Sequence, residues 1–297
     1  MHPVPVHPAG AKVWAGQPPE RKSGAVRSAP PRPIENLDIE LPGYAWDLLP
    51  PLDNYRAHNW QCFQYFEQSH DPAFLDVRRP YVSLYTSLNC PHNCDYCCIH
   101  TIFGKPGIKN WSMDTVAGWI DDLVQKHGVR NFRFADELFM LNRARVTRFC
   151  ELLEERGYDL NIWVYARIDT IFDDLLPRLK KVGVNWICPG IESGNAEVRA
   201  DVNKNIRRDV VSTIRAIQDA GIHIIGNYMF GLPHDTLETM QQTLDLALEL
   251  ANLIAKDGVA VPIQAVRRPM SPPLRPARRS WRATVSRSDC IDTGLTR

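Results

Sequence analysis

Short β-branched or aromatic runs alternate with helical patterns over residues 80–253, and this alternation limits the folds open to the chain. A strand followed by a helical pattern of about ten to fifteen residues is typical of βα units, which build a parallel sheet. Right-handed crossovers bring the carboxyl ends of such strands to one edge, where ligands bind. We predict an α/β fold, a partial TIM-like (β/α) barrel with five clear βα units and a sixth that is missing or degenerate. The expected strands are residues 82–88, 129–134, 160–165, 184–187 and 222–230.

Residues that commonly begin and end helices stand between the expected strands. A serine or asparagine side chain can cap the first turn, and a glycine just beyond the last turn adopts the left-handed conformation that stops a helix. Apolar residues recur at helical spacing between these signals. The expected boundaries are Ser112 to Gly128, Asn142 to Gly157, two helices ending at Gly183 and Gly221, and a last helix over residues 236–253.

The two ends of the chain lack this pattern. Residues 1–36 contain eight prolines and no apolar period, which predicts a flexible segment, and residues 37–80 read as an aromatic-rich linker or strap packed on the core at residues 81–255. Residues 259–266 could form a sixth strand, but Pro262 interrupts them. The Arg/Pro-rich tail, residues 256–297, is therefore expected to be disordered.

Composition narrows the classes of function. The formal net charge is +1, which gives no global attraction to nucleic acid, and the basic tail has one aromatic residue and no nucleic-acid-binding motif, so we expect no nucleic-acid partner. No run of eighteen apolar residues is present, and the first thirty residues lack the apolar region of a secretory signal, so we expect no membrane span and a cytoplasmic location. The eight cysteines then indicate thiolate ligands and buried side chains rather than disulfides.

Three cysteines stand close together directly after the first expected strand: Cys90, Cys94 and Cys97. Three thiolates at this spacing on one loop can bind three irons of a 4Fe-4S cluster and leave the fourth iron open to another ligand. Electron-transfer ferredoxins instead supply a fourth cysteine, and zinc sites usually pair two shorter cysteine motifs. Chance cysteines or a structural zinc remain the alternatives.

The triplet, with the aromatic Tyr96 before its last cysteine, resembles the CxxxCxxC signature of the radical S-adenosylmethionine (SAM) superfamily, and the similarity extends over residues 81–253. The resemblance implies a 4Fe-4S cluster on Cys90, Cys94 and Cys97, with SAM bound to the open iron through its amino and carboxylate groups. It also implies that the reduced cluster cleaves SAM to a deoxyadenosyl radical, that an external donor such as flavodoxin or ferredoxin supplies the electron, and that the backbone of Tyr96 contacts the adenine.

Further positions of the resemblance lie at the ends of the expected strands. Asp136 and Glu137 follow the second strand, where the family keeps an acidic motif for the SAM amino group; two solvated acids are the alternative. Arg167 follows the third strand and could hold the SAM carboxylate with its forked guanidinium, or form a salt bridge with Asp169. The run through Asn142 resembles cobalamin-type members of the family.

The fourth and fifth expected strands carry the remaining candidates. Glu192 and Ser193 occupy the position that the family uses for the SAM ribose hydroxyls and carboxylate. Asn227 lies in the stretch of residues 226–233, where glycines would let the backbone approach the adenine. No residue is assigned as catalytic from the sequence.

Residues 31–50 resemble the linker that joins a cobalamin-binding domain to the core in one subfamily. About 80 residues precede the core, too few for that domain, and no Asp-x-His-x-x-Gly run is present, so cobalamin is left as an open alternative. The leading hypothesis is a radical SAM enzyme that attacks a C–H bond of an unknown small-molecule, lipid or saccharide substrate; methyl transfer, rearrangement and oxidation stay open. The alternatives are a noncatalytic iron–sulfur or zinc protein and an inactive truncated fragment of a cobalamin-dependent enzyme, while methylthio transfer lacks a second cysteine triplet.

Overall fold

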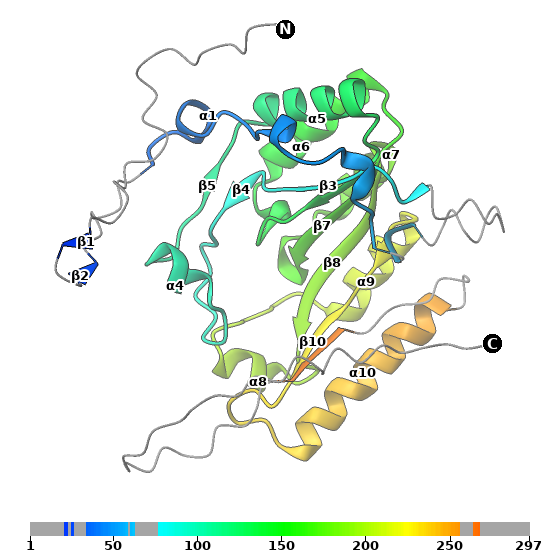
Figure 1. Ribbon diagram of the computed structural model, residues 1–297. Helices are drawn as coiled ribbons and strands as arrows, with labels where there is room; N and C mark the ends of the chain where they lie inside the picture. Colours follow the sequence, from blue (N-terminus) through cyan, green and yellow to red (C-terminus); the bar gives the residue numbers. More distant parts are fainter. Residues whose placement is uncertain are drawn as a thin grey trace, which may run out of the picture.

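The computed structural model describes residues 21–22, 25–26, 34–58, 60–62, 77–255 and 264–267. Its main sheet is parallel throughout, and the strands stand in space in the order in which they occur in the chain (Figure 1). This singly wound order is that of a (β/α) barrel, so the prediction of a partial barrel is confirmed. From one edge to the other the strands are β3 (Tyr81–Leu84), β6 (Asn131–Phe134), β7 (Asn161–Arg167), β8 (Val184–Glu192), β10 (Asn227–Phe230) and β11 (Gln264–Arg267), with β9 (His223–Ile224) paired to β8.

Helices cover one face of the curved sheet (Figure 1). The Ser112 hydroxyl accepts a hydrogen bond from the backbone N–H of Thr115 at 3.1 Å, and the Asn142 side chain caps the next helix in the same way. Gly128 and Gly157 follow these two helices with φ of +63° and +61°, so the predicted caps are confirmed. The covering helices are α5 (Met113–His127), α6 (Arg143–Arg156), α7 (Leu176–Lys181), α9 (Val210–Asp219) and α10 (Leu237–Ala255).

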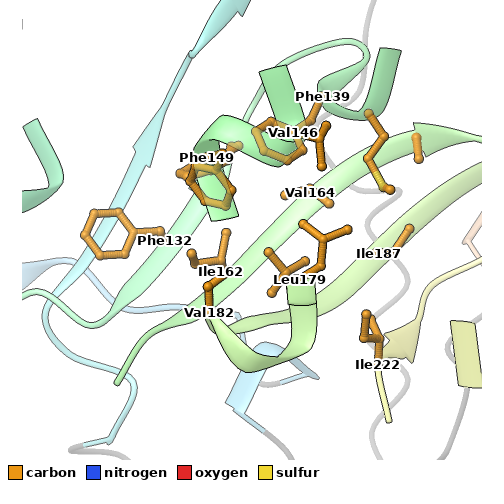
Figure 2. Packing of buried hydrophobic residues seen from close by; sticks show 14 of the residues in the cluster. Phe132, Phe139, Val146, Phe149, Ile162, Val164, Leu179, Val182, Ile187 and Ile222 are labelled. Atoms are coloured by element: carbon orange, nitrogen blue, oxygen red, sulfur yellow. The ribbon is translucent and has the colours of Figure 1, made fainter. Parts of the chain in front are cut away.

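The core lies between the sheet and these helices. Alternate strand residues such as Phe132 and Val164 point outward and pack against Val146 and Phe149 of α6 and Leu179 of α7 (Figure 2). Each such side chain is almost fully removed from solvent, which stabilises the fold by roughly 1.5–3 kcal/mol per residue. The intervening strand residues point to the opposite, concave face of the sheet, which is the interior of the partial barrel.

The expected strand at residues 82–88 is divided in the structure. The strand β3 ends at Leu84, and β4 (Ser87–Leu88) turns away to pair antiparallel with β5 (Lys109–Asn110). Side chains replace the sheet partners at the break: the N–H of Tyr85 donates to the Tyr44 hydroxyl at 2.8 Å, and the N–H of Thr86 donates to Asp136 at 2.6 Å. The loop that carries the cysteines therefore starts outside the sheet.

Residues 34–62, apart from residue 59, pack on the core as a strap. The indole N–H groups of Trp111 and Trp119 donate to the carbonyls of Leu41 and Pro42 at 2.7 and 2.8 Å. The Gln61 amide donates to two backbone carbonyls of β6 and β7. Residues 59 and 63–76 of the expected linker lie outside the described residues. The strap includes the short helices α1 (Leu37–Glu40), η1 (Trp46–Leu48), η2 (Leu52–Asn54) and η3 (Trp60–Cys62).

The expected flexible segment and tail fall mostly outside the described residues. Within residues 1–36 the short strands β1 (Arg21–Lys22) and β2 (Ala25–Val26) pair antiparallel. Within residues 256–297 the strand β11 pairs parallel with β10 and extends the sheet. In the part of the chain that the structure describes, no helix has the length and apolar character needed to cross a membrane.

His223 on β9 gives the fold a pH dependence. Its ring stacks on Trp186 with centroids 4.6 Å apart, and burial, followed by the charge of Lys180, lowers the pKa of His223 from 6.5 to about 4. The unfolded chain therefore takes up this proton first as the pH falls, and stability is lost between about pH 6.5 and pH 4. We expect the free energy of unfolding, measured with urea, to fall by about 2 kcal/mol more in the wild type than in His223→Phe over this pH window.

The matched control for this prediction is His127→Phe, because His127 lies exposed at the end of α5. This variant should lose stability with falling pH as the wild type does. Equal pH dependence of the wild type and His223→Phe would show that His223 does not contribute to acid sensitivity.

Candidate functional site

A cavity of about 260 Å³ opens at the carboxyl ends of the central strands. Its volume lies just below the range for small-molecule sites, about 300–1,000 Å³. Figure 1 shows the loop between β4 and α4 (Ile99–Phe103) facing the carboxyl end of β8. The structure thereby brings together the cysteine triplet and polar residues from three strand ends: Cys90, Cys94, Cys97, Glu137, Arg167 and Glu192 all line the cavity.

The cysteine loop is held from both sides. The N–H of Cys97 donates to the carbonyl of Cys94 at 3.0 Å, which makes a tight turn between these two ligand candidates. The N–H of Asp95 donates to the carbonyl of Val202 at 3.1 Å, and the Asn203 amide donates to the Asp95 carboxylate at 2.7 Å. The loop is thus tied to the segment after α8 (Ala196–Asp201), which lies far away in the sequence.

Arg167 lies at the end of β7, between the cysteine loop and an acid. Its guanidinium forms two hydrogen bonds with Asp169, at 2.9 and 3.0 Å, and its Nη1 is 3.6 Å from the sulfur of Cys94. Both sequence interpretations therefore fit this residue, since it forms the salt bridge and also lines the cavity. Its positive charge faces the position where thiolates would gather.

Glu192 and Lys204 form a buried ion pair in the cavity wall. The Lys204 ammonium is 2.6 Å from Glu192 Oε1, and the two residues are only 4% and 8% exposed. Glu192 has a φ of +67°, an uncommon conformation for a residue other than glycine, and this turn directs its side chain into the cavity. Lys204 was missed by the sequence interpretation, because a single lysine between two asparagines is indistinguishable there from a solvated charge.

Gly190 makes room for this pair. A Cβ at this position would lie 2.6 Å from Lys204 Nζ and 2.7 Å from Glu192 Oε1. Because both side chains are buried and bonded to each other, they cannot simply turn away.

Asp136 does not line the cavity, in contrast to the sequence prediction. It is fully buried and accepts hydrogen bonds from the N–H of Thr86 and from the hydroxyls of Thr86 and Ser87, each at 2.6 Å. Its carboxylate is thus committed to the break between β3 and β4. The adjacent Glu137 lines the cavity instead, and burial, followed by the charge of Asp136, raises the pKa of Glu137.

Ser193 also lies behind the cavity wall rather than in it. Its hydroxyl is 3.1 Å from the hydroxyl of Thr243 on α10 and accepts from the N–H of Asn195 at 3.1 Å. The residue is fully buried. Its contacts secure the end of β8 against α10, and Ser193 is not among the residues that line the cavity.

Tyr96 and Asn227 complete the predicted set and both line the cavity. Tyr96 packs against Val198, Met229 and Leu232, and burial, then the charges of Glu192 and Cys94, raises its pKa. The Asn227 amide donates to the sulfur of Cys188 at 3.1 Å. The structure thus gathers all the predicted site residues except Asp136 and Ser193 around one cavity.

Comparison with known proteins agrees with this geometry. The family model described as the radical SAM superfamily matches residues 84–247, which is more than half of the chain and includes the cysteine loop and every strand end that lines the cavity. The chain belongs to the radical SAM superfamily. Members of this superfamily use a 4Fe-4S cluster and SAM.

Curated relatives of the radical SAM domain are named for different activities. An uncharacterized methyltransferase, PH0819 of Pyrococcus horikoshii, is 26% identical over 249 residues, which cover 83% of this chain and 50% of the relative. The anaerobic magnesium-protoporphyrin IX monomethyl ester cyclase of Rubrivivax gelatinosus is 28% identical over 235 residues, which cover 77% of this chain and 38% of the relative. The chain thus spans half or less of the length of these two relatives.

Solved structures support the fold of the radical SAM domain. The cobalamin-dependent SAM radical enzyme OxsB with aqua-cobalamin bound has a TM-score of 0.56 at 18% identity, covering 76% of this chain and 31% of that one. The radical SAM methyltransferase TsrM from Kitasatospora setae, with tryptophan and a SAM analogue bound, has a TM-score of 0.53 at 19% identity, covering 57% and 34%. At these identities the similarity concerns the fold alone.

The donor set of the cavity fits the cluster of the radical SAM family. Seven cysteines of the described chain are free, and four of them line the cavity: the three of the motif and Cys188. No three His, Cys, Asp or Glu side chains of the described residues converge as they would around a single ion, but a cluster does not require this, because each thiolate binds a different iron. Burial raises the pKa of the Cys90 and Cys97 thiols, and iron binding displaces their protons.

Proposed function

We propose that this protein reductively cleaves SAM at a 4Fe-4S cluster and uses the resulting deoxyadenosyl radical on a substrate that the fold does not name. The observation that carries the proposal is that the three cysteines of the CxxxCxxC motif and charged groups from three strand ends line one cavity. A cluster alone needs no such surrounding of charged side chains. A cluster with an amino acid derivative bound to its open iron does need them.

In this proposal Cys90, Cys94 and Cys97 hold the cluster. The amino and carboxylate groups of SAM require an acceptor and a cation, respectively. Glu137 supplies a carboxylate to the cavity lining, and Arg167 and Lys204 supply cations. The remaining SAM contacts are assigned to Tyr96, Glu192 and Asn227.

Asp136 and Ser193 are proposed to act indirectly. Asp136 fixes the start of the cysteine loop through Thr86 and Ser87, and Ser193 fixes the end of β8, which carries Glu192. Both residues therefore position groups of the cavity without touching SAM.

We further propose a cytoplasmic location and an external electron donor such as flavodoxin or ferredoxin. A reducing compartment keeps cysteine ligands available, and seven cysteines of the described chain are free. Radical SAM enzymes in general require an electron donor. The two curated relatives named above are a methyltransferase and a cyclase at similar identity, so identity does not select the outcome of the reaction. The proposal assigns no described residue to cobalamin and does not depend on it.

Gly190→Ala is expected to weaken SAM binding about tenfold. The new methyl group would separate Lys204 from Glu192 and push both side chains into the SAM cavity. The dissociation constant for SAM, measured by equilibrium dialysis on the cluster-loaded protein, checks this. Gly118→Ala on α5 is the control, because a Cβ there meets nothing within 4 Å; unchanged SAM affinity in Gly190→Ala would contradict the assignment of the pair.

The proposed function is tested by anaerobic reconstitution with iron and sulfide, followed by addition of SAM and dithionite. We expect a 4Fe-4S absorption and formation of 5′-deoxyadenosine. A cluster without SAM cleavage would favour the noncatalytic iron–sulfur protein or the inactive fragment. Failure of a folded protein to bind any cluster would overturn the proposal.

A further inference from the structure

Arg133 on β6 points into the interior of the partial barrel. Its neighbours Phe132 and Phe134 are fully buried in the core on the other face of the sheet. Since side chains alternate along a strand, Arg133 lies on the concave face. It pairs in register with Ser83 of β3 and Trp163 of β7, whose side chains share that face.

Among the described residues, aromatic groups and not an acid hold the guanidinium of Arg133. It lies over the rings of Trp163 and Tyr165, with its carbon 5.4 and 5.2 Å from their centroids, and its Nη2 donates to the Tyr165 hydroxyl. Its Nε is buried without a hydrogen-bond partner. Among the described residues, no carboxylate lies within the 4 Å of an ion pair, whereas the nearby cations Arg167 and Lys204 both have one.

This arrangement lies directly below the cavity. Tyr165 and Cys188, which are neighbours in register on β7 and β8, line the cavity, so Arg133 is one hydrogen bond away from it. Ser83 is exposed although Val82 and Leu84 beside it are buried, which shows that the barrel interior next to Arg133 is open to solvent. A partly buried cation with unused donors next to open space is suited to a ligand anion.

We propose that Arg133 and the Tyr165 hydroxyl bind an anionic group, a carboxylate or a phosphate, of the molecule on which the radical acts. This inference rests on the proposed function and narrows its substrate class. A guanidinium fork matches both anions. The rings of Tyr165, which lines the cavity, and of Trp163 lie beside Arg133, so the part of the substrate next to the anion is apolar or aromatic.

The test is isothermal titration calorimetry on the anaerobic, cluster-loaded protein without reductant. The probes are phenylacetate, phenyl phosphate and the neutral phenylacetamide. We expect at least one anion to bind at least about tenfold more tightly than the amide, and Arg133→Gln to remove at least about tenfold of that affinity. The anion that binds more tightly identifies carboxylate or phosphate as the group recognised.

The control is Arg130→Gln, since Arg130 is near Arg133 in sequence but exposed and paired with Asp159; it should bind the anions as the wild type does. If Arg133→Gln does not fold, the comparison of the anions with the amide in the wild type still tests whether the protein binds an anionic group. Equal binding of anion and amide, no anion binding up to about 10 mM, or unchanged affinity in Arg133→Gln overturns the inference. Because these titrations involve no SAM cleavage, their outcome is independent of whether deoxyadenosine is formed.

Discussion

Cys97→Ala is expected to abolish 5′-deoxyadenosine formation, lowering it by more than about 100-fold, the upper end of the effect of outer-shell partners of a metal site. Cys97 is one of the three motif thiols at the cavity, and its loss leaves two motif ligands for the cluster. The iron and sulfide content of the reconstituted protein should fall together with the activity. Cluster content and activity are measured on the same sample. A variant that loses activity but keeps a full cluster is thereby distinguished from one that loses the cluster.

Cys98→Ala is the matched control, because Cys98 is the next residue and is also an exposed thiol. It lies at the start of α4 and does not line the cavity. We expect its iron content and its rate of deoxyadenosine formation to stay within about twofold of the wild type. If Cys98→Ala lost the cluster and Cys97→Ala kept it, the assignment of the ligands would be wrong.

Asp136→Asn is expected to destabilise the protein by about 2–3 kcal/mol. The carboxylate accepts three hydrogen bonds from Thr86 and Ser87, whereas in the amide one of its two oxygens is replaced by an NH2 group that cannot accept them. Arg145, whose guanidinium donates to the Thr86 carbonyl at 2.6 Å, would also lose the favourable charge of Asp136. Urea unfolding followed by circular dichroism measures the loss.

The comparison for this prediction is Asp122→Asn. Asp122 pairs with Lys126 at 2.8 Å, but both side chains are more than half exposed, and such pairs contribute about 0–1 kcal/mol. A loss below about 1 kcal/mol in Asp136→Asn would therefore show that Asp136 contributes no more to stability than an acid in a surface ion pair. It would restore the interpretation of Asp136 as a SAM ligand rather than a structural residue.

Much of the fold could be predicted from the sequence, because the signals were local. Ser112 and Asn142 cap helices through their own side chains, and Gly128 and Gly157 stop them through their own backbone, so each signal acts within one turn. The break after Leu84 could not be predicted in this way. It depends on Tyr44 and Asp136, which lie about forty and fifty residues from it in the sequence.

The site was predictable to the extent that it is contiguous. Cys90, Cys94 and Cys97 stand in one motif, and the structure brings all three to the cavity. Lys204 could not be identified because only the unusual backbone turn at Glu192 and the space above Gly190 bring the two charges together. In the sequence, Arg133 likewise looks like an ordinary charged residue of a strand. Only the structure shows that, among the described residues, no acid pairs with it, in contrast to Arg167 and Lys204.

The attachment of the cysteine loop to Asn203 has a consequence for the order in which the protein matures. Asp95 and Asn203 are 108 positions apart, yet their hydrogen bond helps to hold the turn between Cys94 and Cys97. A nascent chain that has left the ribosome only as far as α6 already carries every thiol of the motif, but it lacks this support. Iron is therefore expected to enter after synthesis has passed residue 203. The cluster would then form only on a chain in which Asn203 already supports the cysteine loop.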